Sequence, residues 1–349
     1  MLKYRRRVVL VHPFDAFGGA QRVAATLARA LADLSFDLHV YLGFGSVGFV
    51  SEIGGVRRFW GLDNVFLRKI FYPLWLIAFA PRMLMSAIRG ELVWANTVNA
   101  IPAVLPMLVL RPRSVIIHVH EIEFAKVTSL LLNWAVRRGA VVLCVSNLHR
   151  ERLAIPCRVL LNCVDHASES IATRPPILVF VGALSKLKGF PLFLDVVRRI
   201  PLGRVRAVAY VPSLPASANA LVSDARAAGI DIRTGISRCE EMFDGASLLL
   251  QCTDPTIWTE TFSLVMVEAL ACGVPVATAG MAVAPEILGD AQAFDVPSRN
   301  PDRIAEKVLA LLGDPIQLES LRIAAKRRRQ VYSFDAFKSQ VSDVVHGFA

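Results

Sequence analysis

The sequence predicts an α/β protein of two doubly wound, parallel-sheet domains that face each other across a cleft. Short apolar runs of strand length alternate with longer segments of helical periodicity through both halves of the 349 residues. A chain of this length is typical of two domains, each large enough to bury a core of its own. Residues 165–176, which contain Ser, Thr and two prolines, interrupt the alternation as a linker does.

Composition narrows the choice of partner. The formal net charge is +10, and residues 1–165 carry all of the excess, with 20 Lys and Arg against 10 Asp and Glu. No zinc-finger, RNP or basic-helix motif accompanies this charge, so we expect no nucleic-acid partner. The hydrophobic content of 54% favours an anionic membrane surface instead.

Six scattered cysteines without C-x2-C spacing indicate reduced thiols and a cytoplasmic protein. The apolar run after the basic M-L-K-Y-R-R-R start is too short for a signal peptide.

The stretch from Asp254 to Thr278 carries the chemistry. Glu260 and Glu268 stand eight positions apart, with a helix predicted to begin after Ser263 and to end at Gly273, before a short buried strand. The first N–H groups of a helix have no intrahelical partner and attract phosphate. Two carboxylates that flank such a terminus suit the hydroxyls of a sugar nucleotide, although a structural helix with a solvated acid remains the alternative. The N–H groups concerned belong to Thr261, Phe262, Ser263 and Leu264.

Two glycine-containing loops follow predicted strands. Gly18 and Gly19 precede a predicted helix over residues 21–34, and Gly182 opens a loop that reaches Lys188 before the next helix. Glycines let a backbone approach a ligand closely at a helix start, whereas the alternative for each loop is a plain strand-to-helix turn.

His118 and His120 lie at the carboxyl end of a predicted strand over residues 114–119, in the run H-V-H-E. Their spacing places both side chains on one face, at the carboxyl edge where open parallel sheets bind ligands. No third residue is spaced to complete a zinc site, so ligand contact and a satisfied core histidine remain the two interpretations.

An uncharged segment, Ile70 to Pro81, is flanked by Arg68, Lys69, Arg82 and Arg89. It is too short to span a bilayer, and it could lie in the membrane interface with Tyr72 and Trp75 at headgroup level. The alternative is a buried helix interrupted near Pro73. A second uncharged run, over residues 92–110, contains Asn and Pro residues that favour a strand, a polar turn and a buried helix over a membrane span.

Together these motifs resemble glycosyltransferase family 4. The resemblance rests on the Glu-x7-Glu spacing of Glu260 and Glu268, on A-L-A-C-G-V-P-V-A-T after it, on A-P-E-I-L at residues 284–288, and on G-G-A-Q-R-V at residues 18–23. It implies the GT-B fold, with two Rossmann-like domains and transfer from a nucleotide sugar with retention of configuration, without a metal or other cofactor. The implied domains are an acceptor-side domain over residues 1–165, a donor domain over 166–334, and a terminal helix over 335–349 that crosses back to the first.

The resemblance also assigns roles to residues of this sequence. It implies that Glu260 positions the donor sugar, that Glu268 holds the ribose, that Lys188 binds the diphosphate and that His120 contacts donor or acceptor. The glycines would line the cleft, with Gly18 and Gly19 on one side and Gly182 on the other. At the position of the family's second diphosphate-binding cation, an Arg, this sequence has Ala183.

We therefore expect a retaining hexosyltransferase, peripheral at the cytoplasmic face of the membrane, that acts in lipid-linked glycan or surface-polysaccharide biosynthesis. A UDP- or GDP-sugar would be the donor. The alternatives are a GT-B sugar-nucleotide epimerase or hydrolase, and a non-catalytic scaffold subunit that binds sugar nucleotides.

Overall fold

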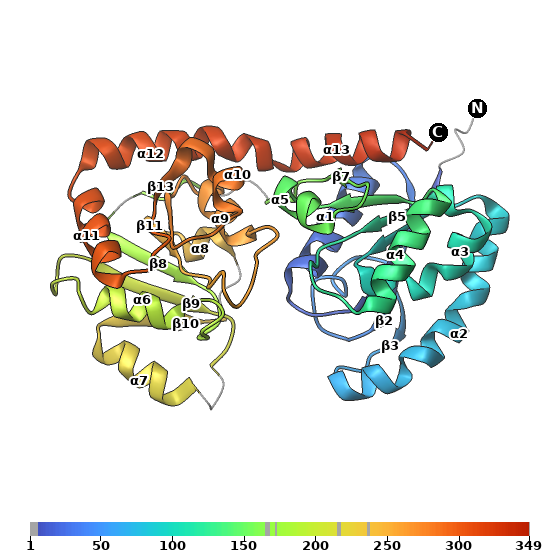
Figure 1. Ribbon diagram of the computed structural model, residues 1–349, viewed down its shortest axis with the longest axis horizontal. Helices are drawn as coiled ribbons and strands as arrows, with labels where there is room; N and C mark the ends of the chain where they lie inside the picture. The colour runs from blue at the N-terminus through green and yellow to red at the C-terminus, as the bar shows by residue number, and fades with distance from the viewer. Residues whose placement is uncertain (1–5, 165–167, 172, 215–217, 236–237, 349) are drawn as a thin grey trace. The chain divides into compact units, whose positions relative to one another are not determined.

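The structure is a computed structural model that describes residues 6–164, 168–171, 173–214, 218–235 and 238–348. It divides into two compact units, of which the first combines residues 1–163 with residues 334–349 and the second holds residues 164–333. Each unit is a parallel sheet with helices on both faces (Figure 1). The predicted pair of doubly wound α/β domains is confirmed.

The first unit contains a seven-stranded parallel sheet in the order β3-β2-β1-β4-β5-β6-β7. Val8 in its centre pairs with Leu38 on one side and with Leu92 on the other. The strands are β1 (Arg7–Phe14), β2 (Asp37–Phe44), β3 (Arg57–Trp60), β4 (Leu92–Asn96), β5 (Val115–His118), β6 (Val141–Cys144) and β7 (Arg158–Val159). Sequence reasoning missed β3, whose four residues are all exposed at the sheet edge and show no apolar periodicity.

Alternate residues of β1 enter two separate cores. Val9 and Val11 pack with helices α2 and α4, whereas Val8 and Leu10 pack with α1 and α13. Burial on both faces leaves no polar position from Val8 to Val11, which explains this continuous apolar run within β1. The helices are α1 (Gly19–Asp33), α2 (Val65–Arg89), α3 (Leu105–Leu110), α4 (Lys126–Arg138), α5 (Asn147–Leu153) and α13 (Phe334–His346).

The last helix, α13, belongs to the first unit. Its Phe337 and Val341 share a core with Leu27 of α1. The Arg29 guanidinium lies 3.8 Å from the ring centroid of Phe334, a cation–π contact that fixes the same pair of helices. The chain thus returns to the first unit after residue 333.

The second unit contains a six-stranded parallel sheet in the order β10-β9-β8-β11-β12-β13. Its strands are β8 (Ile177–Val181), β9 (Arg206–Val211), β10 (Ile230–Thr234), β11 (Ala246–Gln251), β12 (Val276–Thr278) and β13 (Gln292–Asp295). Its helices are α6 (Phe190–Val197), α7 (Asn219–Ala227), α8 (Cys239–Met242), α9 (Leu264–Ala271), α10 (Ala284–Leu288), α11 (Pro301–Leu312) and α12 (Pro315–Arg328).

Both sheets reverse their strand order once. The reversal falls between β1 and β4 in the first sheet and between β8 and β11 in the second. At such a point the connections leave toward opposite faces, so a crevice opens beyond the carboxyl ends of the two strands. Functional residues are expected in the loops that follow these four strands.

Helix α2 runs without a break through Pro73 and Pro81, and the expected interruption near Pro73 is wrong. Asn64 caps its start, accepting hydrogen bonds from the N–H groups of Phe66 and Leu67, and Gly90 ends it in the left-handed conformation. Both prolines are exposed. By length and composition alone, α2 is long and apolar enough to cross a membrane, while 28% of its most apolar stretch is buried within the unit.

Some of the residues expected to anchor this segment in a membrane interface make contacts inside the unit instead. Trp75 is 1% exposed in the core, and the Tyr72 hydroxyl donates to the Asn99 carbonyl at 2.5 Å. Arg82 forms an ion pair with buried Glu91 at 2.7 Å. The expectation is wrong for Trp75 and Arg82, because the uncharged segment does not reveal which face of the helix packs on the sheet.

Candidate active site

The second unit brings Lys188 and Glu260 together. Lys188 ends the loop after β8, Glu260 lies in the loop after β11, and the Lys188 ammonium donates a hydrogen bond to Glu260 Oε1. The two side chains are 35% and 16% exposed. A further hydrogen bond, from the Asp254 N–H to the Leu187 carbonyl at 2.9 Å, ties the two loops together. The pair therefore stands at the strand reversal of the second sheet, accessible to a ligand.

Gly189 makes the close approach of these loops possible. Its φ is +73°, and a Cβ at this position would lie 1.7 Å from the carbonyl oxygen of Cys252 at the end of β11. Gly182 has a φ of +154°, a conformation that residues with a side chain rarely adopt. A Cβ added there would lie 3.4 Å from Lys188 Cβ, which is an ordinary contact distance. A side chain at residue 189 would clash with the Cys252 carbonyl, so glycine there lets the turn place Lys188 beside the crevice.

Helix α9 begins as the sequence predicts. Ser263 is its N-cap and accepts a hydrogen bond from the Met266 N–H. Phe262 is buried against the ring of Tyr332, whereas Thr261 and Leu264 are partly exposed beside the helix start. Glu268 is 2% exposed, so it is not the solvated surface acid of the alternative interpretation.

Arg299 is a residue of this site that the sequence analysis missed. Its guanidinium donates to the carbonyls of Cys252, Thr253 and Ala279 at 3.0 Å each, and it lies 3.7 Å from Asp254. It thereby fixes the carboxyl end of β11 and the residue after β12. No local pattern around residue 299 signals this role, because its partners lie 20 to 47 residues away.

Ala183 is exposed in the loop after β8, and Lys186 in the same loop is exposed as well. The structure thus offers Lys186 as a nearby second cation where the resemblance implied an Arg.

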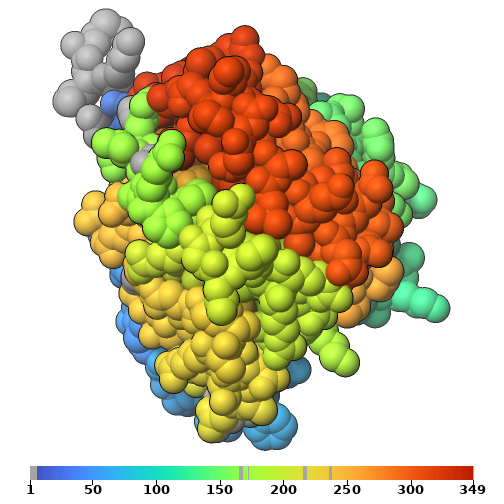
Figure 2. Space-filling view, turned by 90° about the vertical axis from the view of Figure 1, so that its left-hand side faces the viewer, coloured from blue at the N-terminus to red at the C-terminus, as the bar shows by residue number. Residues whose placement is uncertain are grey.

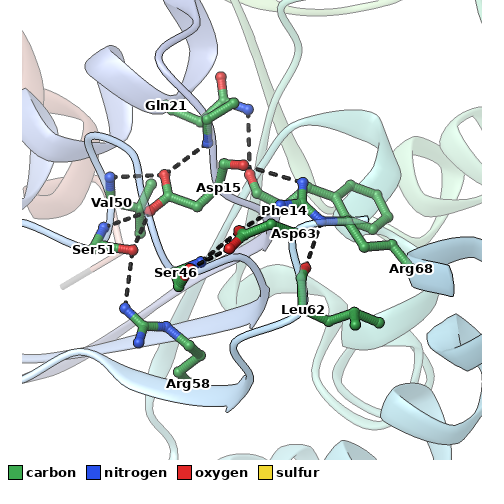
Figure 3. A network of polar contacts seen from close by, with 11 residues as sticks. Phe14, Asp15, Gln21, Ser46, Val50, Ser51, Arg58, Leu62, Asp63 and Arg68 are labelled. Carbon is green, nitrogen blue, oxygen red and sulfur yellow. Dashed lines mark hydrogen bonds and ion pairs between the residues drawn. The ribbon is translucent and has the colours of Figure 1, made fainter. Parts of the chain in front are cut away.

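In the first unit, the start of α1 is open. Gly18 occupies the N-cap position in extended conformation without a side-chain cap, and Gly19 is exposed. The Gln21 side-chain amide donates to the Phe14 carbonyl at 3.2 Å and holds the turn (Figure 3). An uncapped start of a 15-residue helix leaves N–H donors available for an anion.

Asp15, which the sequence analysis did not single out, fastens a second loop against this turn (Figure 3). It is 1% exposed, and its carboxylate accepts from the N–H groups of Ala16, Val50 and Ser51 at 2.9, 3.0 and 2.7 Å. A Cβ on Gly48 would lie 2.4 Å from Asp15 Oδ1, so the glycine-rich loop can wrap the carboxylate closely.

Arg68 supports the same network from helix α2. Its guanidinium donates to the carbonyls of Asp15 and Leu62 at 3.2 and 2.7 Å and pairs with Asp63 at 3.0 Å (Figure 3). Arg68 is therefore a structural residue and not the lipid-facing cation that the sequence suggested.

A chain of hydrogen bonds connects His120 to the start of α1. Asn96, at the end of β4, donates from Nδ2 to the Ala20 carbonyl at 2.9 Å and lies 3.2 Å from Nδ1 of buried His12. Its Oδ1 faces His120 Nε2 at 3.1 Å. An amide oxygen only accepts, so His120 carries its proton on Nε2, and Asn96 fixes both the tautomer and the ring orientation.

Further histidine rings lie beside the hydrogen bonds that join His120 to Asn96. The ring centroids of His118 and His120 are 4.2 Å apart, as expected for two residues on one face of a strand. His149 of α5 contacts the Glu121 carbonyl at 3.0 Å through Nε2. Burial lowers the pKa of His118, His120 and His149, and it lowers that of His12 to about 4. At neutral pH the cluster is uncharged.

The pKa of His12 predicts a pH dependence of stability. Burial, reinforced by the neighbouring His120, keeps the folded-state pKa near 4, against 6.5 for an ordinary histidine. Between these values the unfolded chain binds a proton that the folded protein does not, so the free energy of unfolding falls as pH falls from about 6.5 to 4. In His12→Gln, the decrease in the free energy of unfolding between pH 6.5 and pH 4 should be smaller by about 3 kcal/mol. Urea unfolding at pH 7, 5 and 4 measures it.

His346 provides the control, because it is exposed on α13. His346→Gln should lose as much stability at acid pH as the parent protein does. If His12→Gln also loses as much as the parent, burial of neutral His12 is not the cause of the pH dependence.

The described residues contain no group of three or more His, Cys, Asp or Glu side chains arranged to hold a metal ion. Of the predicted residues, the second unit joins Lys188 directly to Glu260, and the first unit joins His120 to the start of α1 through Asn96.

Two family models match the chain. The model described as Glycosyltransferase Family 4 matches residues 17–168, and the model described as Glycosyl transferases group 1 matches residues 175–314. Together they cover most of the chain. No curated protein sequence matches it.

Solved structures share the fold over nearly the whole chain. Sucrose-phosphate synthase from Thermosynechococcus elongatus is 14% identical with a TM-score of 0.81, and the match covers 98% of this chain and 99% of that protein. HepE from Anabaena in complex with UDP-glucose is 15% identical with a TM-score of 0.76 and the same coverage. WaaG, a glycosyltransferase involved in lipopolysaccharide biosynthesis, is 14% identical with a TM-score of 0.71, and 98% of this chain covers all of it.

Proposed function

Since the chain belongs to the glycosyltransferases of family 4 and group 1 and has the GT-B fold, we propose that it transfers a hexose, with retention, from a UDP- or GDP-sugar. The acceptor is a lipid-linked glycan or surface polysaccharide at the cytoplasmic face of the membrane. The observation that carries the proposal is the accessible pair of Lys188 and Glu260 at the strand reversal of the second sheet.

Lys188 and Glu260 bind different parts of the donor in this proposal. Lys188 stabilises the negative charge that develops on the leaving diphosphate, together with the N–H groups at the start of α9. Glu260 accepts hydrogen bonds from the donor sugar, and Glu268 from the ribose. In the absence of a ligand each charge of the pair neutralises the other, so both are in place before the donor arrives.

The reaction breaks the bond between the anomeric carbon and the diphosphate oxygen and forms one to the acceptor oxygen. The acceptor proton passes to the departing phosphate oxygen on the same face of the sugar, which leads to retention without a protein general base. His120, held through Nε2 by Asn96, contacts donor or acceptor.

The nucleotide can be identified by thermal shift. Binding to the native state alone raises the apparent stability, so UDP, GDP and their sugars should separate by the shift they cause. The complex of HepE with UDP-glucose makes UDP the first choice. Turnover should then be measured with lipid acceptors and with excess EDTA present, which we expect to leave the rate unchanged because no metal takes part. Loss of activity in EDTA, or no shift with any nucleotide, would contradict the proposal.

Ala183 favours a second candidate, a non-catalytic scaffold subunit that binds a sugar nucleotide for a partner transferase. Its exposed methyl group offers no hydrogen bond to phosphate. In that case the purified chain would bind the nucleotide but transfer no sugar until the partner is added.

Helix α2 supplies the contact with the membrane in this proposal. No Asp or Glu occurs within Val65–Arg89, and exposed Lys69 and Arg89 stand near its two ends. Packed against it, α3 exposes Leu105, Val109 and Leu110. We propose that this surface lies on anionic lipid, with its apolar residues in the interface. The exposed stripe of α2 consists of Phe66, Ile70, Leu74, Ile77, Leu84, Met85 and Ile88.

Replacing two residues of the stripe should detach the protein from vesicles. Ile70 and Ile77 are 53% and 71% exposed, so Ile70→Glu with Ile77→Glu leaves the core intact. We expect at least a tenfold loss of co-sedimentation with phosphatidylglycerol vesicles, since each apolar side chain contributes about 1.5 kcal/mol or more. The matched control is Ile316→Glu with Leu202→Glu, at exposed positions of the second unit. Equal loss in both pairs would argue against α2 as the docking surface.

A further inference from the structure

A cavity of about 810 Å³ lies at the amino ends of the second sheet. Pro176 precedes β8, Val205 precedes β9 and Ser247 stands near the start of β11, and all three line it. Parallel strands all point the same way, so this edge of the sheet is opposite the one that carries Lys188 and Glu260. The segments that line the cavity are visible in Figure 2, where the segment before β8 is green and helices α11 and α12 are red-orange.

Arg322 of α12 forms the floor of this cavity and is 7% exposed. Two of its nitrogens donate to the carbonyls of Ser170 and Ala246 at 2.9 and 2.8 Å. Its Nε has no hydrogen-bond partner, and no carboxylate within the described part of the chain pairs with it. A buried guanidinium without an anion is costly, because neutral carbonyls replace only part of its hydration.

No acidic residue of the cavity forms an ion pair with Arg322, although the negative charge of Glu319 offsets part of the effect of its burial. Glu169 is engaged by Lys326 at 2.8 Å and by Arg329 at 3.2 Å. Glu319 is exposed on α12. The lining therefore has four cationic side chains against two acidic ones, and the cationic set consists of Arg174, Arg204, Arg322 and Lys326.

Arg174 and Arg204 complete the cationic side of the cavity. Both are exposed, and neither forms an ion pair among the residues that the structure describes. The rest of the lining includes apolar side chains of α11 and α12, among them Leu309, Leu312 and Leu318. Guanidinium groups beside an apolar wall suit a ligand with a phosphate at one end and an organic part at the other.

We propose that this cavity is a second binding site, for a phosphate-bearing ligand distinct from the nucleotide sugar. The phosphate contacts the exposed Arg174 and Arg204, beside the positive charge of buried Arg322, and the organic part lies on the leucines. The source of the phosphate is either a small phosphorylated metabolite or the headgroup of a lipid. The proposal does not depend on the transferase reaction, since the site lies at the other edge of the sheet.

Calorimetric titration tests the site with two probes, inorganic pyrophosphate and soluble dihexanoyl phosphatidate. We expect saturable binding and a rise in melting temperature with at least one of them. Tighter binding of pyrophosphate would identify the natural ligand as a small phosphorylated metabolite. Tighter binding of phosphatidate would identify it as a lipid headgroup. Arg174→Ala with Arg204→Ala should weaken binding at least tenfold, because both charge-assisted hydrogen-bond donors to the phosphate are removed. Arg322 is left in place because it also holds the backbone.

Two control variants separate this site from others. Arg226→Ala removes an equally exposed charge from α7 and should bind both probes like the parent. Lys188→Ala should bind phosphatidate like the parent, and it should keep the part of the pyrophosphate binding that does not belong to the donor site. The proposal is overturned if neither probe binds, if the Arg174 and Arg204 variant binds as well as the parent, or if Lys188→Ala abolishes binding.

Discussion

Lys188→Ala and Glu260→Ala should each lower the turnover number about 1,000-fold while the fold survives. Removing one preorganised group that stabilises transition-state charge typically costs a factor of about 100 to 1,000, and Lys188 is the cation that contacts the carboxylate of the donor site. The loss should appear in kcat, since the charge on the leaving diphosphate develops only as the bond breaks. Initial rates with the donor identified by thermal shift measure it.

Lys186→Ala is the matched control, because Lys186 lies two residues earlier in the same loop and is exposed. A modest effect there would show that position, and not charge alone, makes Lys188 essential. A large loss in Lys186→Ala would instead identify Lys186 as the second diphosphate cation beside Ala183. Full activity of both Lys188→Ala and Glu260→Ala, with unchanged melting temperatures, would refute the proposed donor site.

Gly189→Ala should destabilise the second unit by more than about 4 kcal/mol, beyond the range of ordinary substitutions. The new Cβ would stand 1.7 Å from the Cys252 carbonyl oxygen, and that oxygen belongs to backbone that Arg299 holds. Neither side of this contact can yield without separating the loop after β8 from the end of β11. Urea unfolding followed by circular dichroism measures the loss.

Gly203→Ala separates the clash from the cost of the backbone conformation. Gly203 has a φ of +79°, close to that of Gly189, and a Cβ added there would meet no atom within 4 Å. It should cost about 1–2 kcal/mol, the usual penalty for an L-residue in the left-handed region. If both variants lose the same stability, the close packing of Gly189 on Cys252 is not what the loop requires.

The class of the fold and much of the donor site could be predicted from the order of the amino acids. Strand β1 was recognisable because burial on both faces keeps Val8 to Val11 continuously apolar, and α9 because Ser263 and Gly273 mark its ends. The functional spacing of Glu260 and Glu268 lies within one short segment. Signals of this kind depend on neighbours along the chain, so no tertiary contact is needed to recognise them.

Which faces are buried and which distant residues meet became clear only from the packing of the folded chain. The pattern of α2 allowed Trp75 and Arg82 to face lipid, but packing on the sheet turned both inward and left the opposite stripe exposed. Asp15 and Arg299 gained their roles from backbone groups tens of residues away. Asn96 came to hold His120 because β4 pairs with β5 and places Asn96 opposite His118, two residues before His120. Hydrogen bonds across such separations leave no periodic trace in a sequence, because the folded backbone alone brings their partners within reach.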